Sequence, residues 1–240
     1  MAALRRLRER RPAVHVLTSP VALELSANVL LALGAEPSLT TDAAAMRAFV
    51  AGTDALVVNL GMLDPQRHAA ALAAAEVARA LGRPWLLDPV KVELDADRLA
   101  LARRLLAWQP RIVRGNDAEI AALTAGRAPA DFARAAGTVL ARTGPEDLVT
   151  DGGQEARVRS GSPLMDRVTA IGCAASAAAG AFLAVEPDPW LAAVAALLVV
   201  GVAGEIAAER ARGPGSFRVE FLDALHGLET GHLCARARLR

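Results

Sequence analysis

The 240-residue chain has no tyrosine, and its five phenylalanines and three tryptophans make up only 3% of it. With so few rings available for stacking, binding to sugars or to unpaired bases is not favoured. The chain also lacks an excess of charge of either sign, because 27 basic and 26 acidic residues leave a net charge of +1. A nearly neutral chain without a basic stretch argues against nucleic acid and against an anionic membrane surface as partners.

Cysteine is scarce as well. Cys173 and Cys234 are too few for a disulfide framework, and the first sixteen residues contain no apolar run typical of a signal peptide. We therefore expect a cytoplasmic protein. Residues 168–185 carry no charge and approach a membrane span in length. Because this segment is rich in alanine and contains two glycines and a serine, we interpret it as a buried helix.

The abundant residues are small and apolar. Hydrophobic residues form 53% of the chain, and 55 residues are alanine, whereas Lys91 is the only lysine. Such a composition excludes a disordered chain and suits closely packed helices around one large core. We expect a single domain over residues 1–240, with a peripheral arm at 1–11 and a peripheral tail at 229–240.

Short β-branched segments alternate with longer helical ones. Strands are predicted at residues 14–17, 55–59, 85–88, 111–114, 148–150 and 156–159. Helices are predicted at residues 21–33, 42–51, 65–81, 97–108, 116–125 and 130–141, and three more are predicted from residue 169 onward. This alternation predicts an α/β fold whose parallel sheet is covered on both faces.

Asn59, Asp88 and Asn116 stand at or just after predicted strand ends, where α/β sheets bind their ligands. Asp88, which precedes a proline, suits either a Mg²⁺ site or a turn cap. Asn116 and Glu119 have the spacing of a capping box, which leaves open whether Glu119 caps the helix or faces a metal–phosphate cluster. The four histidines have no metal-ligand spacing, and no serine, histidine and aspartate suggest a hydrolase.

Small residues open the alanine-rich helix near residue 171. Ala170, Ile171 and Gly172 would let backbone N–H groups approach an anion at the helix N-terminus. Cys173 in the first turn is expected to have a lowered pKa for the same reason. The alternative is that this cysteine is inert packing among alanines.

Ordered motifs along residues 12–228 resemble the hydroxyethylthiazole kinase family of the ribokinase-like superfamily. They are His15-Val16-Leu17-Thr18, Ser26-Ala27-Asn28, Leu30-Leu31-Ala32-Leu33-Gly34-Ala35, Asn59-Leu60-Gly61, Leu87-Asp88-Pro89-Val90, Arg114-Gly115-Asn116, Val149-Thr150-Asp151-Gly152, Gly172-Cys173, Gly180-Ala181-Phe182-Leu183-Ala184 and Gly213-Pro214-Gly215-Ser216-Phe217. The resemblance implies a three-layer α/β/α sandwich with a mostly parallel central sheet. It also implies ATP and Mg²⁺, and a homotrimer with active sites between subunits.

The same resemblance implies a role for individual residues. The reaction would be phosphorylation of the primary alcohol of 4-methyl-5-(2-hydroxyethyl)thiazole, with residues 170–173 forming an anion hole and Cys173 at the position of the base. The remaining implied roles are Arg114, Thr143 and Asn116 for ATP, Asp88 and Glu119 for Mg²⁺, and Ser19, Leu39, Gly61, Met62 and Ala170 for the thiazole.

Several positions depart from the family pattern, namely Ser19, Leu39, Met62, Lys91 and Ala170. One explanation of these substitutions is neutral sequence drift within the family. An alternative is that the chain is a kinase for a different small alcohol. A third reading is a weakly active or non-catalytic nucleotide-binding relative, since a left-handed Ala170 would cost about 1–3 kcal/mol. Lys91 could neutralise phosphate, pair with Asp88 or be a solvated loop residue.

Overall fold

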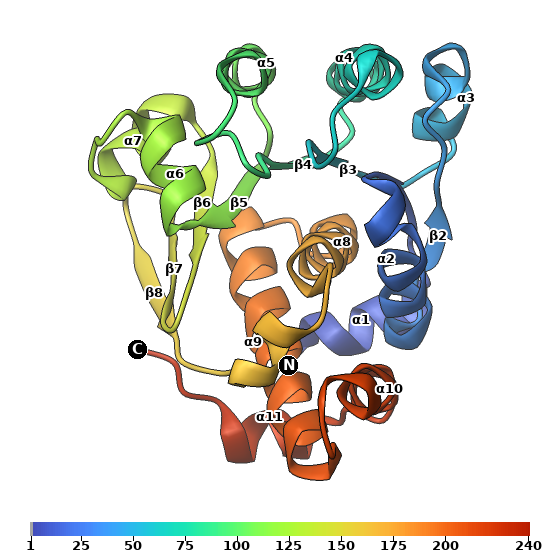
Figure 1. The fold of residues 1–240 in the computed structure, drawn as a ribbon, viewed down its shortest axis with the longest axis vertical. Coiled ribbons are helices and arrows are strands. Elements are labelled where there is room, and N and C mark those ends of the chain that lie inside the picture. The colour runs from blue at the N-terminus through green and yellow to red at the C-terminus, as the bar shows by residue number, and fades with distance from the viewer. Residues whose placement is uncertain (1) are drawn as a thin grey trace.

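The computed structural model describes residues 2–240, which are built on one eight-stranded sheet (Figure 1). The strand order is β2-β1-β3-β4-β5-β6-β7-β8. The strands are β1 (Ala13–Leu17), β2 (Glu36–Ser38), β3 (Ala55–Asn59), β4 (Trp85–Asp88), β5 (Ile112–Asn116), β6 (Val139–Thr143), β7 (Asp147–Thr150) and β8 (Glu155–Val158). All pairs from β2 to β6 are parallel, and β7 and β8 add an antiparallel hairpin, so the predicted mostly parallel sheet is confirmed.

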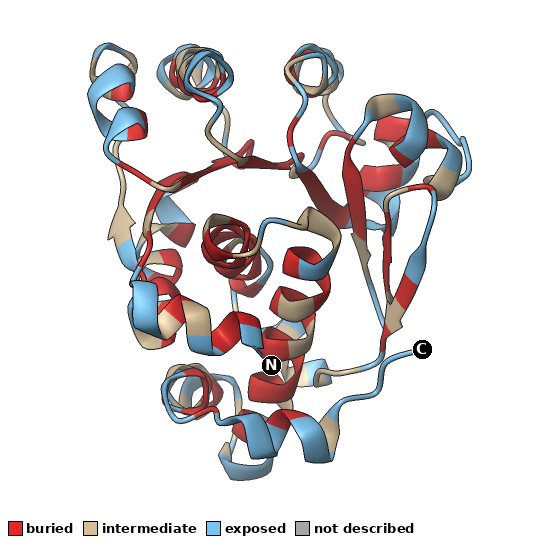
Figure 2. Ribbon diagram, turned by 180° about the vertical axis from the view of Figure 1, so that it is seen from behind, coloured by how far each residue is buried: buried red, intermediate tan, exposed pale blue. Residues whose placement is uncertain are grey.

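Helices cover both faces of the sheet, which gives the three layers seen in Figure 1. One layer contains α3 (Met46–Ala51), α4 (Pro65–Leu81), α5 (Ala96–Leu106), α6 (Asp117–Thr124) and α7 (Pro129–Ala136). The other contains α1 (Ala2–Arg10), α2 (Pro20–Leu33), α8 (Ile171–Val185), α9 (Pro189–Arg210), α10 (Pro214–His226) and α11 (Thr230–Arg236). Each layer buries its own hydrophobic cluster against the sheet, as the buried strands and α8 show in Figure 2.

The central helix α8 explains much of the alanine content. Twelve of its fifteen residues are buried, because it packs between the sheet and the helices α2 and α9. A Cβ atom added at Gly180 would lie 2.4 Å from Cγ2 of Val57 in β3. At such distances only small side chains fit, so alanine and glycine allow the helix to approach the sheet.

Two strands were not predicted. Residues 130–141 were expected to form one helix, but α7 ends at Ala136, where Gly137 takes a left-handed φ of 63°, and β6 begins at Val139. The apolar residues of β6 continue the helical pattern by chance, and only pairing with β5 makes them a strand. Strand β2 is three residues long and contains Pro37, so no periodicity marks it.

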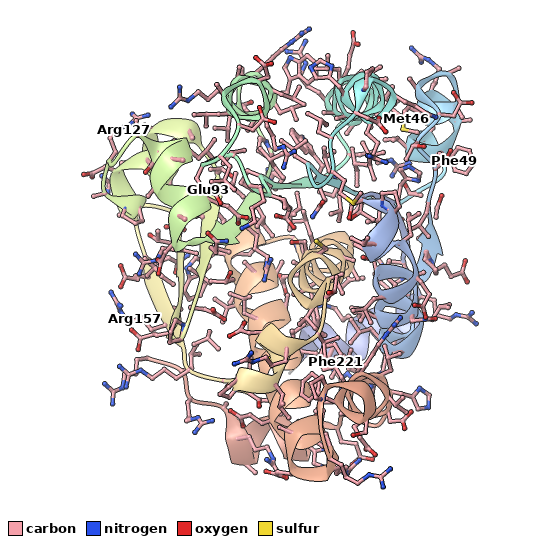
Figure 3. The ribbon with its side chains drawn as sticks, in the orientation of Figure 1. Met46, Phe49, Glu93, Arg127, Arg157 and Phe221 are labelled. Atoms are coloured by element: carbon pink, nitrogen blue, oxygen red, sulfur yellow. The ribbon has the colours of Figure 1, made fainter. Side chains whose placement is uncertain are left out.

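The N-terminal arm packs more closely than expected, whereas the C-terminal tail is ordered but mostly exposed. The 1–11 arm was expected at the periphery, but α1 buries Leu4 and Leu7, and Arg8 donates hydrogen bonds to three carbonyls between residues 225 and 228. The tail forms a fourth C-terminal helix, α11. Beyond it, Arg240 exchanges backbone hydrogen bonds of 2.8 and 3.0 Å with Arg157, which Figure 3 shows on β8. The tail therefore covers part of the exposed edge of the sheet.

Helix α9 is the one helix within residues 2–240 that is long and apolar enough to cross a membrane. Its most apolar window is 72% buried inside the protein, as expected for a core helix. Asp188 caps its start by accepting a hydrogen bond from the N–H of Trp190 at 2.9 Å.

Candidate functional site

A cavity of about 640 Å³ opens at the carboxyl ends of β4, β5 and β6. The start of α8 and residues 159–166 close it from the other side. The predicted site residues that line this cavity are Asp88, Arg114, Asn116, Glu119, Thr143, Ile171, Gly172 and Cys173. The fold thus collects these predicted residues from four separate segments of the chain, at the sheet edge where the sequence placed them.

The N-terminus of α8 forms one wall. Ala170 is its N-cap with φ 69° and ψ 8°, which confirms the left-handed conformation considered for this residue. The first helical hydrogen bond runs from the N–H of Ala174 to the carbonyl of Ala170. The N–H groups of residues 171–173 therefore precede the helical ladder and remain available for an anion. A Cβ atom at Gly172 would meet only Nη1 of Arg114, at 3.8 Å.

Asp88 lies at the end of β4 and is 2% exposed. Its Oδ2 accepts hydrogen bonds from Nδ2 of Asn59 and from Oγ of Ser176, both at 2.7 Å. Burial raises the pKa of Asp88 to about 6 and Glu119 adds to this, while Arg114 and the two hydrogen bonds oppose it. Asp88 is therefore mainly ionised at neutral pH. Only its Oδ2 is held by hydrogen bonds, and both donors, Asn59 and Ser176, are uncharged.

Glu119 caps its helix, and its carboxylate also lines the cavity. Its Oε2 accepts from the N–H of Asn116 at 2.8 Å and Oδ1 of Asn116 accepts from the N–H of Glu119 at 2.9 Å, which completes a capping box. Its Oε1 accepts from the N–H of Lys91 at 3.1 Å. The carboxylate also lines the cavity, so capping fixes it in place without removing it from the site.

Lys91 itself lies outside the cavity wall. Its Nζ is 3.6 Å from Oε1 of Glu93, a residue labelled in Figure 3, and its side chain is 57% exposed. Pairing with Asp88 is therefore wrong, and Lys91 is a solvated loop residue whose N–H binds Glu119. Its φ of 61° lies in the left-handed region, which is uncommon for a residue other than glycine.

Arg114 on β5 is 9% exposed. Its Nη1 donates to Oγ of Ser176 at 3.3 Å, and its buried Nε has no hydrogen-bond partner among residues 2–240. Thr143, at the end of β6, donates to the carbonyl of Gly115 at 3.3 Å. A buried guanidinium with an unused donor beside a cavity is suited to binding an anion, because an isolated donor is costly to bury.

The expectation of a lowered pKa for Cys173 is wrong. The pKa of its thiol is raised from 9.0 to about 11, chiefly by burial and then by the negative charge of Asp88, against a smaller opposing effect of Asn59. A helix N-terminus contributes only about 0.3–1 kcal/mol in favour of the thiolate. Desolvation and a neighbouring carboxylate outweigh it, so the thiol is protonated at neutral pH.

The predicted substrate-side residues lie apart from this cavity. Ser19 follows β1 and Gly61 follows β3, and a Cβ atom at Gly61 would lie 3.4 Å from Cβ of Ser19. Leu39 is half-buried after β2, and Met62 is 53% exposed with a φ of 47°. None of these four, nor Ala170, lines the cavity. Ser19, Leu39, Gly61 and Met62 follow β1, β2 and β3, near the point where β1 and β3 lead to opposite sides of the sheet. At such a switch point α/β folds commonly bind ligands in a crevice.

Two residues connect these parts: Asn59, noted from the sequence as a strand-end residue but given no individual role there, and Ser176, which the sequence prediction omitted. Asn59 donates to Asp88, and its Oδ1 accepts from the N–H of Gly61 at 2.9 Å, so it links the cavity wall to the loop after β3. Ser176 joins Arg114 to Asp88. Their positions were available as signals, since Asn59 ends a strand and Ser176 lies one helical turn after Cys173.

Within residues 2–240 no three His, Cys, Asp or Glu side chains converge on a metal position. Mg²⁺ does not need such a cluster, because it commonly binds one or two carboxylates together with water and phosphate oxygens. Asp88 and Glu119 both line the cavity, and in the described chain no hydrogen bond reaches Oδ1 of Asp88. These oxygens fit a phosphate-bound Mg²⁺.

Comparisons with known proteins point to one family. The model of the hydroxyethylthiazole kinase family matches residues 4–130 and 124–231. The hydroxyethylthiazole kinase of Granulibacter bethesdensis is 46% identical over 97% of this chain and 91% of its own length. The solved hydroxyethylthiazole kinase protein from Pyrococcus horikoshii superposes with a TM-score of 0.96, at 36% identity over 100% of this chain and 97% of the other.

A more distant structure shares the fold. Pyridoxal kinase from Staphylococcus aureus in complex with AMP-PCP superposes with a TM-score of 0.65 at 18% identity, over 81% of this chain and 88% of the other. The alignment with the relative that is 46% identical spans nearly the whole chain, and the two segments matched by the family model include all residues of the site described above. The chain therefore belongs to the hydroxyethylthiazole kinase family, with the ribokinase-like α/β/α fold.

Proposed function

We propose that this kinase transfers the γ-phosphoryl group of ATP to the primary hydroxyl of 4-methyl-5-(2-hydroxyethyl)thiazole. The products are the thiazole phosphate and ADP, and the reaction provides the thiazole half of thiamine. The observation that carries this proposal is the full-length family match combined with a cavity that contains the family's acidic, basic and helix N-terminal groups.

The ATP phosphates bind between Arg114 and the N-terminus of α8. The guanidinium of Arg114, which lines the cavity, and the N–H groups of residues 171–173 supply donors from two sides. Thr143 and Asn116 line the same cavity and contact the remainder of the nucleotide. Phosphoryl transfer depends mainly on positioning and charge neutralisation, and these groups provide both.

Asp88 and Glu119 hold Mg²⁺ and its water ligands in this proposal. When bound, the ion neutralises charge on the phosphate oxygens of ATP. Asp88 offers Oδ1, while its Oδ2 is held by Asn59 and Ser176, so the carboxylate has a defined orientation before any ligand binds.

Cys173 contacts the acceptor hydroxyl at the head of α8. With a thiol pKa of about 11, roughly one molecule in ten thousand carries the thiolate at pH 7. As a base, Cys173 therefore adds little to the rate, and most of the acceleration comes from electrostatic stabilisation of the transferred group.

The thiazole binds in the crevice between β1 and β3, against Ser19, Leu39, Gly61, Met62 and Ala170. Met62 is exposed on the isolated chain, which supports completion of this crevice by a neighbouring subunit in a homotrimer. The enzyme acts in the cytoplasm.

The test is incubation of the enzyme with ATP, Mg²⁺ and the thiazole alcohol, followed by measurement of ADP. We expect ADP formation that depends on the alcohol, and an acceptor-free reaction serves as the control. Absence of thiazole-dependent ADP at high enzyme concentration contradicts the proposal. A panel of other small alcohols then distinguishes a kinase of altered specificity from a nucleotide-binding relative without turnover.

A further inference from the structure

The hydroxyl of Ser176 lies between two opposite charges at the cavity. Ser176 is completely buried on α8, one turn after Cys173. Its Oγ donates to Oδ2 of Asp88 at 2.7 Å and accepts from Nη1 of Arg114 at 3.3 Å. A serine hydroxyl is both donor and acceptor, so one small group satisfies the carboxylate and the guanidinium together.

Arg114 and Asp88 form no direct ion pair, although both are buried in the same wall. Among the salt bridges of residues 2–240, none joins them within 4.0 Å. Opposite charges attract strongly where water is excluded. A direct pair would occupy the donors of Arg114 and an oxygen of Asp88, and would draw both side chains away from the cavity.

We propose that Ser176 is a spacer that keeps Arg114 and Asp88 apart. It thereby leaves the guanidinium for the phosphate groups of the nucleotide and Oδ1 of Asp88 for the cation that accompanies them. The inference rests on the proposed role of this cavity as a nucleotide site, and it does not depend on which alcohol accepts the phosphoryl group.

The fold keeps this spacer in a fixed place. Gly180, one turn further along α8, packs so closely on Val57 that the helix cannot move toward the sheet. Asn59 holds Oδ2 of Asp88 from the opposite side at 2.7 Å. Removal of the hydroxyl therefore leaves a small gap into which the long arginine side chain can move, while the helix and the aspartate stay in position.

The experiment measures ATP binding by calorimetry in EDTA, so that neither metal nor turnover contributes. We expect Ser176→Ala to bind ATP about tenfold more weakly than the wild type, because Asp88 then competes with the phosphates for a charged hydrogen bond from Arg114. Ser26→Ala is the matched control, because Ser26 is equally buried in α2 and its Oγ has no hydrogen-bond partner in the described chain. It should bind ATP as the wild type does. Thermal unfolding confirms that each variant is folded.

A second pair of proteins tests the spacer role itself. If direct pairing with Asp88 causes the loss, Ser176→Ala should change ATP affinity less than about twofold when introduced into Asp88→Asn, because the attracting charge is gone. Ser176→Thr, which restores a hydroxyl, should recover at least half of the lost binding free energy. With Mg²⁺ present, KM for ATP should rise in Ser176→Ala more than kcat falls.

Three results would overturn the proposal: an unchanged affinity in Ser176→Ala, an equal loss in the wild-type and Asp88→Asn backgrounds, or no metal-free ATP binding by the wild type. If the wild type binds ATP as described but does not phosphorylate the thiazole alcohol, only the proposed acceptor is wrong. The spacer role of Ser176 then stands.

Discussion

Acidification should destabilise the folded chain through His15. This histidine lies in β1 and is completely buried, with Nδ1 3.0 Å from Oγ of Ser38 and no partner among the described residues for Nε2. Burial lowers its pKa from 6.5 to about 4, against a smaller opposing effect of the backbone at Thr40. Protonation would place a charge in a site that is closed on one side by the ring of Phe49, 5.5 Å away between ring centres.

The sign and size follow from proton linkage. Because the folded pKa lies below the unfolded one, the unfolded chain binds more protons between pH 4 and 6.5, so stability falls as the pH is lowered through that window. The contribution is complete above pH 6.5. The loss from this one residue reaches about 2 kcal/mol at pH 5 and about 3 kcal/mol at pH 4, and changes little below that.

The assay is urea unfolding from pH 4 to pH 8 for the wild type and His15→Asn. The variant retains a polar group near the position of Nδ1 but cannot take up a proton, so the difference between the two curves isolates His15 from the titration of the carboxylates. His68→Asn removes an exposed imidazole on α4 and controls for the substitution. Parallel curves for the wild type and His15→Asn would refute the reasoning.

Three further predictions concern the cavity. Cys173→Ala should lower kcat by about tenfold and leave the ATP affinity unchanged, because the thiol contacts the acceptor but contributes little as a base. Steady-state kinetics measure kcat and calorimetry measures the affinity. An unchanged kcat excludes Cys173 from the acceptor site. Glu119→Gln should raise the Mg²⁺ concentration required for half-maximal activity about tenfold. Its thermal stability should stay near that of the wild type, since glutamine also completes a capping box. An unchanged Mg²⁺ titration contradicts this prediction. Gly172→Val should weaken ATP binding about tenfold, because the added valine side chain points at Arg114 and obstructs the helix N-terminus. A wild-type ATP affinity measured by calorimetry contradicts this prediction.

Local patterns were sufficient for most of the sheet. The predicted strands at 14–17, 55–59 and 85–88 correspond to β1, β3 and β4, because short apolar runs followed by a polar residue can be recognised from neighbours in sequence. Strand β6 was missed because its apolar residues follow α7 after only two intervening residues, and pairing with β5 and β7 decides its conformation. The packing of the N-terminal arm was missed for the same reason, since Arg8 of α1 binds carbonyl groups more than 215 residues away in sequence.

The candidate site likewise contains residues that local patterns predict and features that depend on tertiary contacts. Residues with chemistry at strand ends, such as Asp88 and Arg114, were recognised from their place in ordered motifs. The segment 159–166 could not be foreseen as a cavity wall, because it depends on the close approach of Ser160 to Gly201 of α9, where an added Cβ would lie 2.7 Å from that serine. The pKa of Cys173 was predicted in the wrong direction because the helix N-terminus is local, whereas burial and Asp88 are not.

The sequence by itself determined the α/β class, the family and the carboxyl-edge residues, because these depend on composition, short periodicities and motif order. The structure also explains part of the high alanine and low aromatic content, because α8 approaches the sheet too closely for larger side chains. Only the tertiary structure decided how the charges of the cavity are arranged. A hydroxyl on α8 separates Arg114 from Asp88, and desolvation sets the protonation of Cys173, since both effects depend on groups that folding brings together from distant parts of the chain.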